Sequence, residues 1–146
     1  MSSLAVACLA AALTAAVAFA PDARRPAIAQ EAKPSVVSVN LSNLTMADFT
    51  LEEASIDGGH WLGDAPQRGA TLEVYAAELI RAQTDGPGGQ SGLIVLTGYG
   101  TPITLRWTLD AQGKLGTSFG GNEKVNVHAV QVANLPHATF TLVERE

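Results

Sequence analysis

Most of the chain beyond residue 35 consists of short segments in which apolar and polar side chains alternate, the pattern of half-buried β-strands. The clearest is the segment 103–109, ITLRWTL, which puts its aliphatic residues and Trp107 on one face and its threonines and arginine on the other. Comparable runs lie at residues 36–41, 49–56, 93–97, 115–119, 125–132 and 138–143. Glycine-rich turns separate the segments at intervals of about 8–12 residues. The pattern predicts an all-β protein, a single antiparallel β-sandwich of seven to nine short strands.

The segment 70–82, ATLEVYAAELIRA, is the exception, because its pattern fits two kinds of element. Leu72, Tyr75 and Leu79 recur at the spacing of one helix face, with charged residues largely opposite. Strict alternation fits only the first half of the segment. Taken by itself, the segment favours a helix.

The first 20 residues, MSSLAVACLAAALTAAVAFA, carry no charge and are mostly alanine, leucine and valine. Such a run is short and alanine-rich for a membrane span, and small-residue cleavage patterns lie at residues 16–18 and 27–29. We therefore expect residues 1–29 to be a signal peptide or a bipartite targeting leader, residues 30–35 a polar linker and residues 36–146 the β-sandwich domain. An uncleaved membrane anchor is the alternative for the leader.

The leader also bears on where the protein goes. A cleaved signal peptide predicts secretion. The letters VAFAP, followed by Arg24 and Arg25, also resemble the presequences that direct proteins into the complex plastids of some algae, in which a short basic transit segment follows the signal peptide. Secretion is the first localisation hypothesis, and an algal complex plastid is the second.

The acidic charge of the chain limits its partners. The sequence holds 9 lysines and arginines against 14 aspartates and glutamates, a formal net charge of −5, which becomes −6 once Asp22, Arg24 and Arg25 leave with the leader. The remaining basic residues are scattered singly, which argues against contact with a phosphate backbone and therefore against nucleic acid. Anionic leaflets attract basic residues, so we expect any membrane partner to be a neutral or zwitterionic lipid.

No residue pattern in the sequence predicts catalysis, a cofactor or a metal site. The stretch 88–92, GGQSG, lacks the Gly-x-Ser-x-Gly spacing of a nucleophile elbow. His60, His128 and His137 are not spaced to bind one metal ion from a single strand face or helix turn. The single cysteine, Cys8, lies in the leader, so the mature chain has no disulfide. We expect a protein that is not an enzyme and that uses no cofactor or metal.

Asn40 and Asn43 begin two N-glycosylation sequons, Asn-Leu-Ser and Asn-Leu-Thr. They matter only if the chain passes through a eukaryotic secretory pathway.

Four residues are candidates for contact with a lipid or other ligand. The stretch 54–61, ASIDGGHW, ends an alternating run at two glycines and then presents His60 and Trp61, so we expect a sharp corner with Trp61 at the rim of a binding surface. Tyr99 lies in a second glycine turn, Gly-Tyr-Gly. Tyrosine and tryptophan at loop tips suit a membrane–water interface, where the ring is half wet. Trp107 is the fourth candidate, although its alternation with aliphatic residues favours a place in the core.

The order of these features resembles the aegerolysins, small β-sandwich proteins that bind membrane lipids. The features that match in order are a strand ending in Gly59-His60-Trp61, a glycine-rich loop at residues 86–92 before an apolar strand, and a strand with Trp107 followed by Asp110 and Gly113. The resemblance covers residues 36–144 without a long identical block. The cysteines of the family and its dense aromatic cluster around the tryptophan strand are absent. The resemblance implies a lipid-binding function, and it implies that residues 70–82 form a strand rather than a helix.

We therefore expect a secreted lipid- or membrane-binding β-sandwich module. The resemblance to aegerolysins implies a second protein with which such a module forms a haemolysin-like pore, and the chain itself has no long amphipathic segment to insert. The alternative is a soluble carbohydrate- or protein-binding β-sandwich with no membrane activity. A hydrolase on the same scaffold is a third hypothesis, since a fold does not fix a function.

N-terminal sequencing of the native protein tests the expected leader. We expect mature chains to begin near residue 30, because the uncharged run before Pro21 has the character of a cleaved signal. Native protein that begins at Met1 or Ser2 would contradict this expectation.

Overall fold

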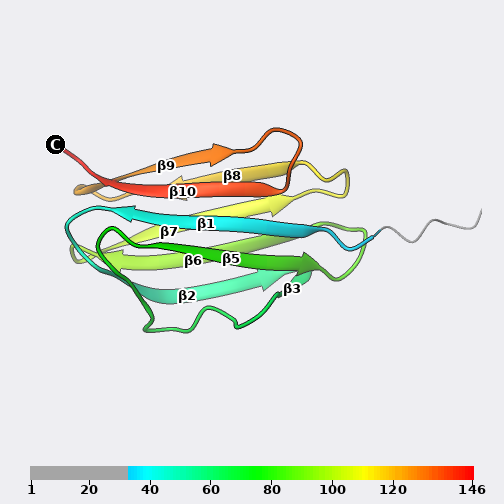
Figure 1. The fold of residues 1–146 in the computed structure, drawn as a ribbon, viewed down its shortest axis with the longest axis horizontal. Helices are drawn as coiled ribbons and strands as arrows, with labels where there is room; N and C mark the ends of the chain where they lie inside the picture. Colours follow the sequence, from blue (N-terminus) through cyan, green and yellow to red (C-terminus); the bar gives the residue numbers. More distant parts are fainter. Residues whose placement is uncertain (1–32) are drawn as a thin grey trace, which may run out of the picture. The chain divides into compact units, whose positions relative to one another are not determined.

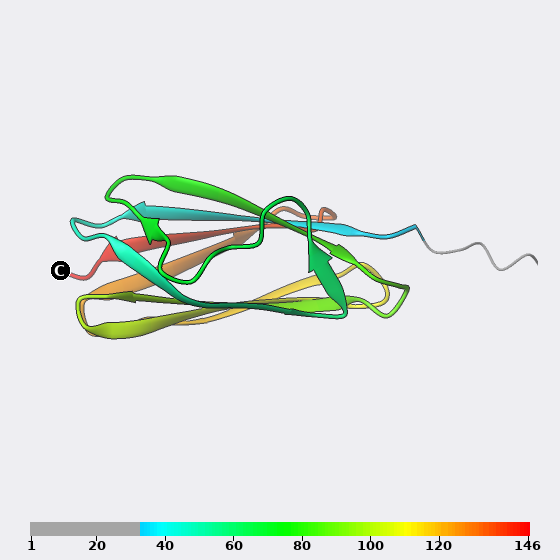
Figure 2. The ribbon, with the colours of Figure 1, turned by 90° about the horizontal axis from the view of Figure 1, so that it is seen from below.

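A computed structural model describes residues 33–146, which fold into two five-stranded β-sheets packed face to face (Figures 1 and 2). The strands are β1 Val36–Leu44, β2 Phe49–Asp57, β3 Gly59–Trp61, β4 Thr71–Leu72, β5 Ala77–Thr84, β6 Gln90–Gly98, β7 Thr101–Leu109, β8 Leu115–Gly120, β9 Val125–Gln131 and β10 His137–Glu144. Within these residues there is no helix long and apolar enough to cross a membrane. The expected leader at residues 1–29 lies outside the described part of the chain.

The strands pair in two sheets that confirm the all-β sandwich expected from the sequence. Sheet A has the order β3-β5-β1-β10-β9, and sheet B has the order β4-β2-β6-β7-β8. All pairs are antiparallel except the central pair of sheet A, in which β1 and β10 run in parallel. The described residues contain ten strands rather than seven to nine, because the loop between β2 and β5 adds two very short ones, β3 and β4.

The alternation read from the sequence is the alternation of burial in the structure. Every second residue of β1, β6, β7 and β10 is buried between the sheets, and the core holds aliphatic side chains with Phe49, Trp107 and Phe140 among them. Trp107 is 1% exposed. Its ring occupies the space above Gly92 of the neighbouring strand, where a β-carbon would lie only 1.9 Å from the indole. The wide indole therefore depends on a glycine beside it.

The helix favoured locally for residues 70–82 is wrong, and the strand implied by the resemblance is correct. The segment forms β4, a turn with Tyr75 in the left-handed region at φ 57°, and the first part of β5. β5 pairs with β1 over seven residues, so a helix here would leave β1 without a partner on that side. Tertiary pairing has overridden a weak local preference for helix.

The DGGHW stretch is a corner at which the chain passes from sheet B to sheet A. β2 ends at Asp57, and β3 then pairs with β5 of the other sheet. Gly58 has a φ of 73°, and a β-carbon there would lie 2.7 Å from the carbonyl oxygen of Gly89. A β-carbon on Gly59 would lie 2.5 Å from the carbonyl oxygen of Gln83. The corner expected from the two glycines is confirmed, and both positions require glycine.

A comparison of two tryptophan variants tests this account of the core. Trp107→Ala should lower the free energy of unfolding by about 3–5 kcal/mol, because it removes a fully buried aromatic side chain. Trp61→Ala should lower it by less than half as much, because Trp61 is only half-buried and packs against the edge of the core. Urea unfolding followed by circular dichroism measures both. Equal losses would show that Trp61 belongs to the core as fully as Trp107 does.

Candidate functional site

The four candidate residues of the sequence do not form a single site. Trp61 and Trp107 come together, with their rings edge to face and the centroids 6.0 Å apart. His60 directly precedes Trp61 in the chain but is exposed to solvent, where its Nδ1 lies 2.6 Å from a carboxylate oxygen of Asp85. Trp107 is buried beneath the sheet and Trp61 is half-buried. This end of the sandwich therefore offers the flank of one indole and an exposed His–Asp pair.

Tyr99 lies at the other end of the sandwich, in the turn between β6 and β7. The β1–β2 turn at residues 45–48 and the β4–β5 turn at residues 73–76 lie at the same end, as does the C-terminus (Figure 1). Each turn carries one exposed apolar or aromatic side chain. These are Met46, Tyr75 and Tyr99, with exposed fractions of 66%, 65% and 40%. We call these three residues the tyrosine tip.

Backbone geometry at the tyrosine tip is unusual. Tyr75 has a φ of 57° and Tyr99 a φ of 55°. A bulky residue in this left-handed region costs about 1–3 kcal/mol and persists only where the surroundings impose it. Glycine or asparagine would occupy either position with less strain. The turns therefore hold tyrosines at a cost in stability, which points to a role for the exposed rings.

A buried asparagine holds two of the three turns together. Asn43 is 0% exposed, and its amide nitrogen lies 2.8, 3.3 and 3.0 Å from the carbonyl oxygens of Ala47, Leu72 and Glu73. Its side-chain oxygen accepts hydrogen bonds from the backbone nitrogen and the hydroxyl of Thr45. One side chain from sheet A thus fixes the turn that carries Met46 and the turn that carries Tyr75.

A second buried asparagine fixes the third turn in the same way. The amide nitrogen of Asn122 donates to the carbonyl oxygens of Gly98 and Thr101, on either side of the turn that carries Tyr99, both at 3.3 Å. Its side-chain oxygen accepts hydrogen bonds from the backbone nitrogens of Lys124 and Val125 at 2.8 Å. The turn is therefore tied to the β8–β9 connection, and Tyr99 stands on a rigid base.

The tyrosine rings are held by contacts of their own. The Tyr75 hydroxyl donates to the sulfur of Met46 at 2.9 Å and so joins the β4–β5 turn to the β1–β2 turn. The ring of Tyr99 packs against the buried ring of Phe49, with the centroids 6.2 Å apart and the planes at 70°. Because aromatic pairs favour this edge-to-face arrangement, Tyr99 is anchored at its base and exposed at its outer side.

Two carboxylates lie next to the tyrosine tip. Glu144 accepts hydrogen bonds from the Tyr99 hydroxyl and, at 3.3 Å, from the backbone nitrogen of Met46. Asp48 accepts one from the backbone nitrogen of Val74 at 2.9 Å, which ties the first turn to the second. The bond to Glu144 raises the pKa of Tyr99, so its phenol remains a neutral donor throughout the physiological range. The tip thus combines neutral aromatic rings with negative charge.

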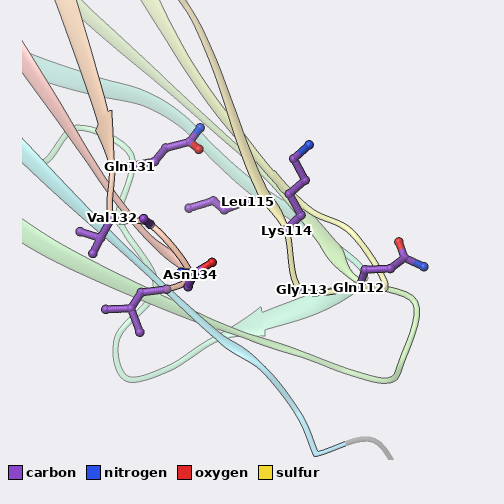
Figure 3. A pocket seen from close by; sticks show the side chains of 9 residues that line it. Gln112, Gly113, Lys114, Leu115, Gln131, Val132 and Asn134 are labelled. Carbon is purple, nitrogen blue, oxygen red and sulfur yellow. The ribbon is translucent and has the colours of Figure 1, made fainter.

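The opposite end of the sandwich carries a polar hollow of about 480 Å³. Figure 3 shows it between the β7–β8 turn, with Gln112 and Lys114, and the β9–β10 loop, with Asn134. Gln131 and the aliphatic residues Leu115, Val132 and Leu135 also line it. None of the four candidate residues and no aromatic side chain takes part. The hollow offers amide groups and one ammonium group to a ligand.

Comparison with known proteins shows the fold. No protein-family model matches the sequence, and no match is found among curated proteins. Among solved structures, IP-1A from Alcaligenes faecalis is similar with a TM-score of 0.61 and 11% identity over 77% of this chain and 92% of that chain. Nakanori, described as a lipid binding protein, is similar with a TM-score of 0.55 and 12% identity over 77% of this chain and 71% of that chain. Both similarities place the chain among β-sandwich proteins of this architecture.

Sequence reasoning found Tyr99 but missed the other two residues of the tyrosine tip. Tyr75 was hidden within a segment that favours a helix, and Met46 was only one residue in a polar turn. Asn43 begins a sequon, yet its amide is buried and lies within hydrogen-bonding distance of three carbonyl oxygens, so the folded protein cannot accept a glycan there. The position of Met46 in the short turn between two predicted strands was the one feature of the sequence that could have indicated an exposed apolar residue there.

Matched asparagine variants test the structural role of Asn43. Asn43→Ala should lower the free energy of unfolding by at least about 2 kcal/mol, because it leaves buried carbonyl groups without a donor. Asn40→Ala, on the outer face of the same strand, should change it by no more than about 0.5 kcal/mol. Thermal and urea unfolding of the two variants give the comparison. If both variants are as stable as the wild type, the turns are held by something other than the Asn43 amide.

Proposed function

We propose that the protein is a secreted, non-enzymatic module that binds membrane lipid through the tyrosine tip. The observation that carries the proposal is the presentation of Met46, Tyr75 and Tyr99 on three turns that two buried asparagines hold in place. Tyrosine combines an apolar ring with a polar hydroxyl and suits the interfacial layer of a bilayer. Methionine is apolar and adaptable, which suits contact with irregular acyl chains.

The charge of the tip supports a neutral or zwitterionic lipid. Asp48 and Glu144 lie among the tip residues, and the whole chain is acidic. Anionic headgroups would be repelled by these carboxylates. A zwitterionic headgroup instead offers a cationic end to the carboxylates and to the faces of the tyrosine rings.

Two resemblances support the lipid proposal. Nakanori, whose fold is similar, is described as lipid binding, and the order of sequence features resembles the aegerolysins. The tyrosine tip is too small to span a bilayer, and no long amphipathic segment occurs in residues 33–146. We therefore propose that any haemolytic activity requires a second, pore-forming protein that this module brings to the membrane.

A soluble carbohydrate- or protein-binding role is the second candidate. The polar hollow between the β7–β8 turn and the β9–β10 loop favours it, because the amides of Gln112, Gln131 and Asn134 can exchange hydrogen bonds with hydroxyl or peptide groups. The two proposals use opposite ends of the sandwich, so variants at the two ends separate them.

Sedimentation with phosphatidylcholine liposomes tests the lipid proposal. The double variant Met46→Ser/Tyr75→Ser should bind about tenfold more weakly than the wild type. Tenfold corresponds to about 1.4 kcal/mol, which is the cost of losing about 55 Å² of buried apolar surface. Addition of phosphatidylserine to the liposomes should weaken the binding of the wild type.

Two control variants carry the same kind of change elsewhere. Leu79→Ser on β5 and Leu135→Ser beside the hollow each remove an exposed leucine, both 57% exposed. They should bind liposomes as the wild type does. If Leu135→Ser weakens liposome binding and the tip variant does not, the membrane faces the other end of the sandwich.

A further inference from the structure

Residues 62–70 join β3 of sheet A to β4 of sheet B and run across the open side of the sandwich, as Figure 2 shows. We call this segment the strap. On this side both edge strands are short, since β3 pairs with β5 of sheet A over three residues and β4 pairs with β2 of sheet B over two. The two sheets are therefore closed here by a loop rather than by strand pairing.

Under the strap lies an apolar cleft between the sheets. It is lined from β1, β2, β4, β5 and β6 and from the middle and the C-terminal end of the strap; the aliphatic lining residues are Leu41, Leu51, Leu72, Ile80, Leu96 and Pro66. Its free volume is about 20 Å³, room for about one water molecule. An apolar space of this kind does not hold water well, since water requires polar partners. Pro66 of the strap lines the cleft and is itself half-buried.

Backbone hydrogen bonds attach the strap to the sheets near its two ends. Leu62 donates to the carbonyl oxygen of Arg81, and Gly69 donates to that of Leu51. Between these two bonds, the strap makes no backbone hydrogen bond to either sheet. Gly63 and Gly69 have φ values of 87° and 85°, and a β-carbon on either would meet no atom within 4 Å. These features give the strap two hinges and free space around them.

One charged residue stands at the mouth of the cleft. Glu78 lies on the face of β5 that is turned toward the other sheet, in register with the buried Leu41. It is exposed there, because the sheets are covered at this point only by the strap. A carboxylate at the mouth disfavours a ligand whose own charge is negative next to its apolar part.

We propose that this cleft takes one hydrocarbon chain of a neutral or zwitterionic lipid when the strap swings outward about Gly63 and Gly69. The hydrocarbon chain of the lipid displaces Pro66 and packs against the leucines that line the cleft. The inference deepens the proposed function, since it supplies the site for part of the lipid that the tyrosine tip meets. Leu41 precedes Asn43 by two residues, about 7 Å along a strand, and Leu72 is bonded to Asn43 through its carbonyl oxygen. The cleft thus adjoins the base of the tyrosine tip.

Octyl glucoside below its critical micelle concentration is the probe, because it presents a single alkyl chain on a neutral headgroup. We expect methyl NMR signals of Leu41, Leu51, Leu72 and Leu96 in the wild-type protein to shift on addition of octyl glucoside and not on addition of glucose. Octanoate should bind more weakly than octyl glucoside, and Glu78→Gln should narrow that difference. Shifts that are absent from these leucines, or confined to exposed residues, would overturn the proposal.

A matched pair of strap variants tests the same site by calorimetry. Both alanines are exposed, but only Ala70 lines the cleft. Ala70→Phe should therefore weaken octyl glucoside binding at least fivefold, whereas Ala65→Phe should bind within twofold of the wild type. A folded Ala70→Phe variant that binds as well as the wild type would contradict the cleft. If Ala70→Phe does not fold, the methyl shifts of the wild type decide the question.

The two proposals fail separately. Liposome binding that depends on the tyrosine tip, without octyl glucoside in the cleft, would overturn the cleft and leave the proposed function intact. If octyl glucoside binds in the cleft but the protein does not bind liposomes, the cleft is supported as a hydrocarbon site and the membrane-binding function is overturned.

Discussion

The buried amide of Asn43 is the interaction on which the proposed binding end depends. A polar side chain inside a β-sandwich lowers stability unless every hydrogen-bonding group has a partner. Asn43 meets this condition by contacting three carbonyl oxygens and accepting two hydrogen bonds from Thr45. Those partners belong to turns on both sheets, so one residue sets the relative positions of Met46 and Tyr75. Replacing it by an apolar residue would fill the space but remove the buried hydrogen bonds between the turns, leaving only the exposed ones between Val74 and Asp48 and between Tyr75 and Met46.

The two ends of the sandwich differ in chemistry in a way that suits a module presented to a membrane. One end has tyrosine rings, a methionine and carboxylates on rigid turns, and the apolar cleft adjoins it. The other end has the polar hollow, the exposed His60–Asp85 pair and the start of β1 at Val36. A protein held at the membrane by the first end would leave the second end free for a partner.

The sequence predicted the fold well because alternation in a strand is a direct record of burial. Ile103, Leu105 and Trp107 are buried as their positions indicated, and the glycines at 58 and 59 turn the chain as expected. Neighbours in space were harder to predict. Within residues 70–82, the part that belongs to β5 forms a strand because it pairs with β1, and the two residues of β4 do so because they pair with β2. Trp61 lies half-buried because the corner directs it against Trp107.

The candidate site was predicted only in part, because it too depends on which residues are neighbours in space. Tyr99 stood out as an aromatic residue between glycines, but its connection to Met46 and Tyr75 arises from three turns far apart in the sequence. The Asn-Leu-Thr sequence at Asn43 has the form of a glycosylation signal, and only burial shows that it is a structural hydrogen-bonding group. Fold neighbours at 11–12% identity illustrate the general case, in which a fold persists after most residue identities are lost.

Hydrogen–deuterium exchange of the protein on phosphatidylcholine vesicles tests whether the tyrosine tip meets the bilayer. The account predicts that exchange slows, relative to the free protein, in the turns at residues 45–48, 73–76 and 99–100, and remains unchanged in residues 110–114 and 132–136 at the other end. Slower exchange confined to that other end, or no change anywhere on vesicles that carry bound protein, would contradict the claim that the tyrosine tip meets the bilayer.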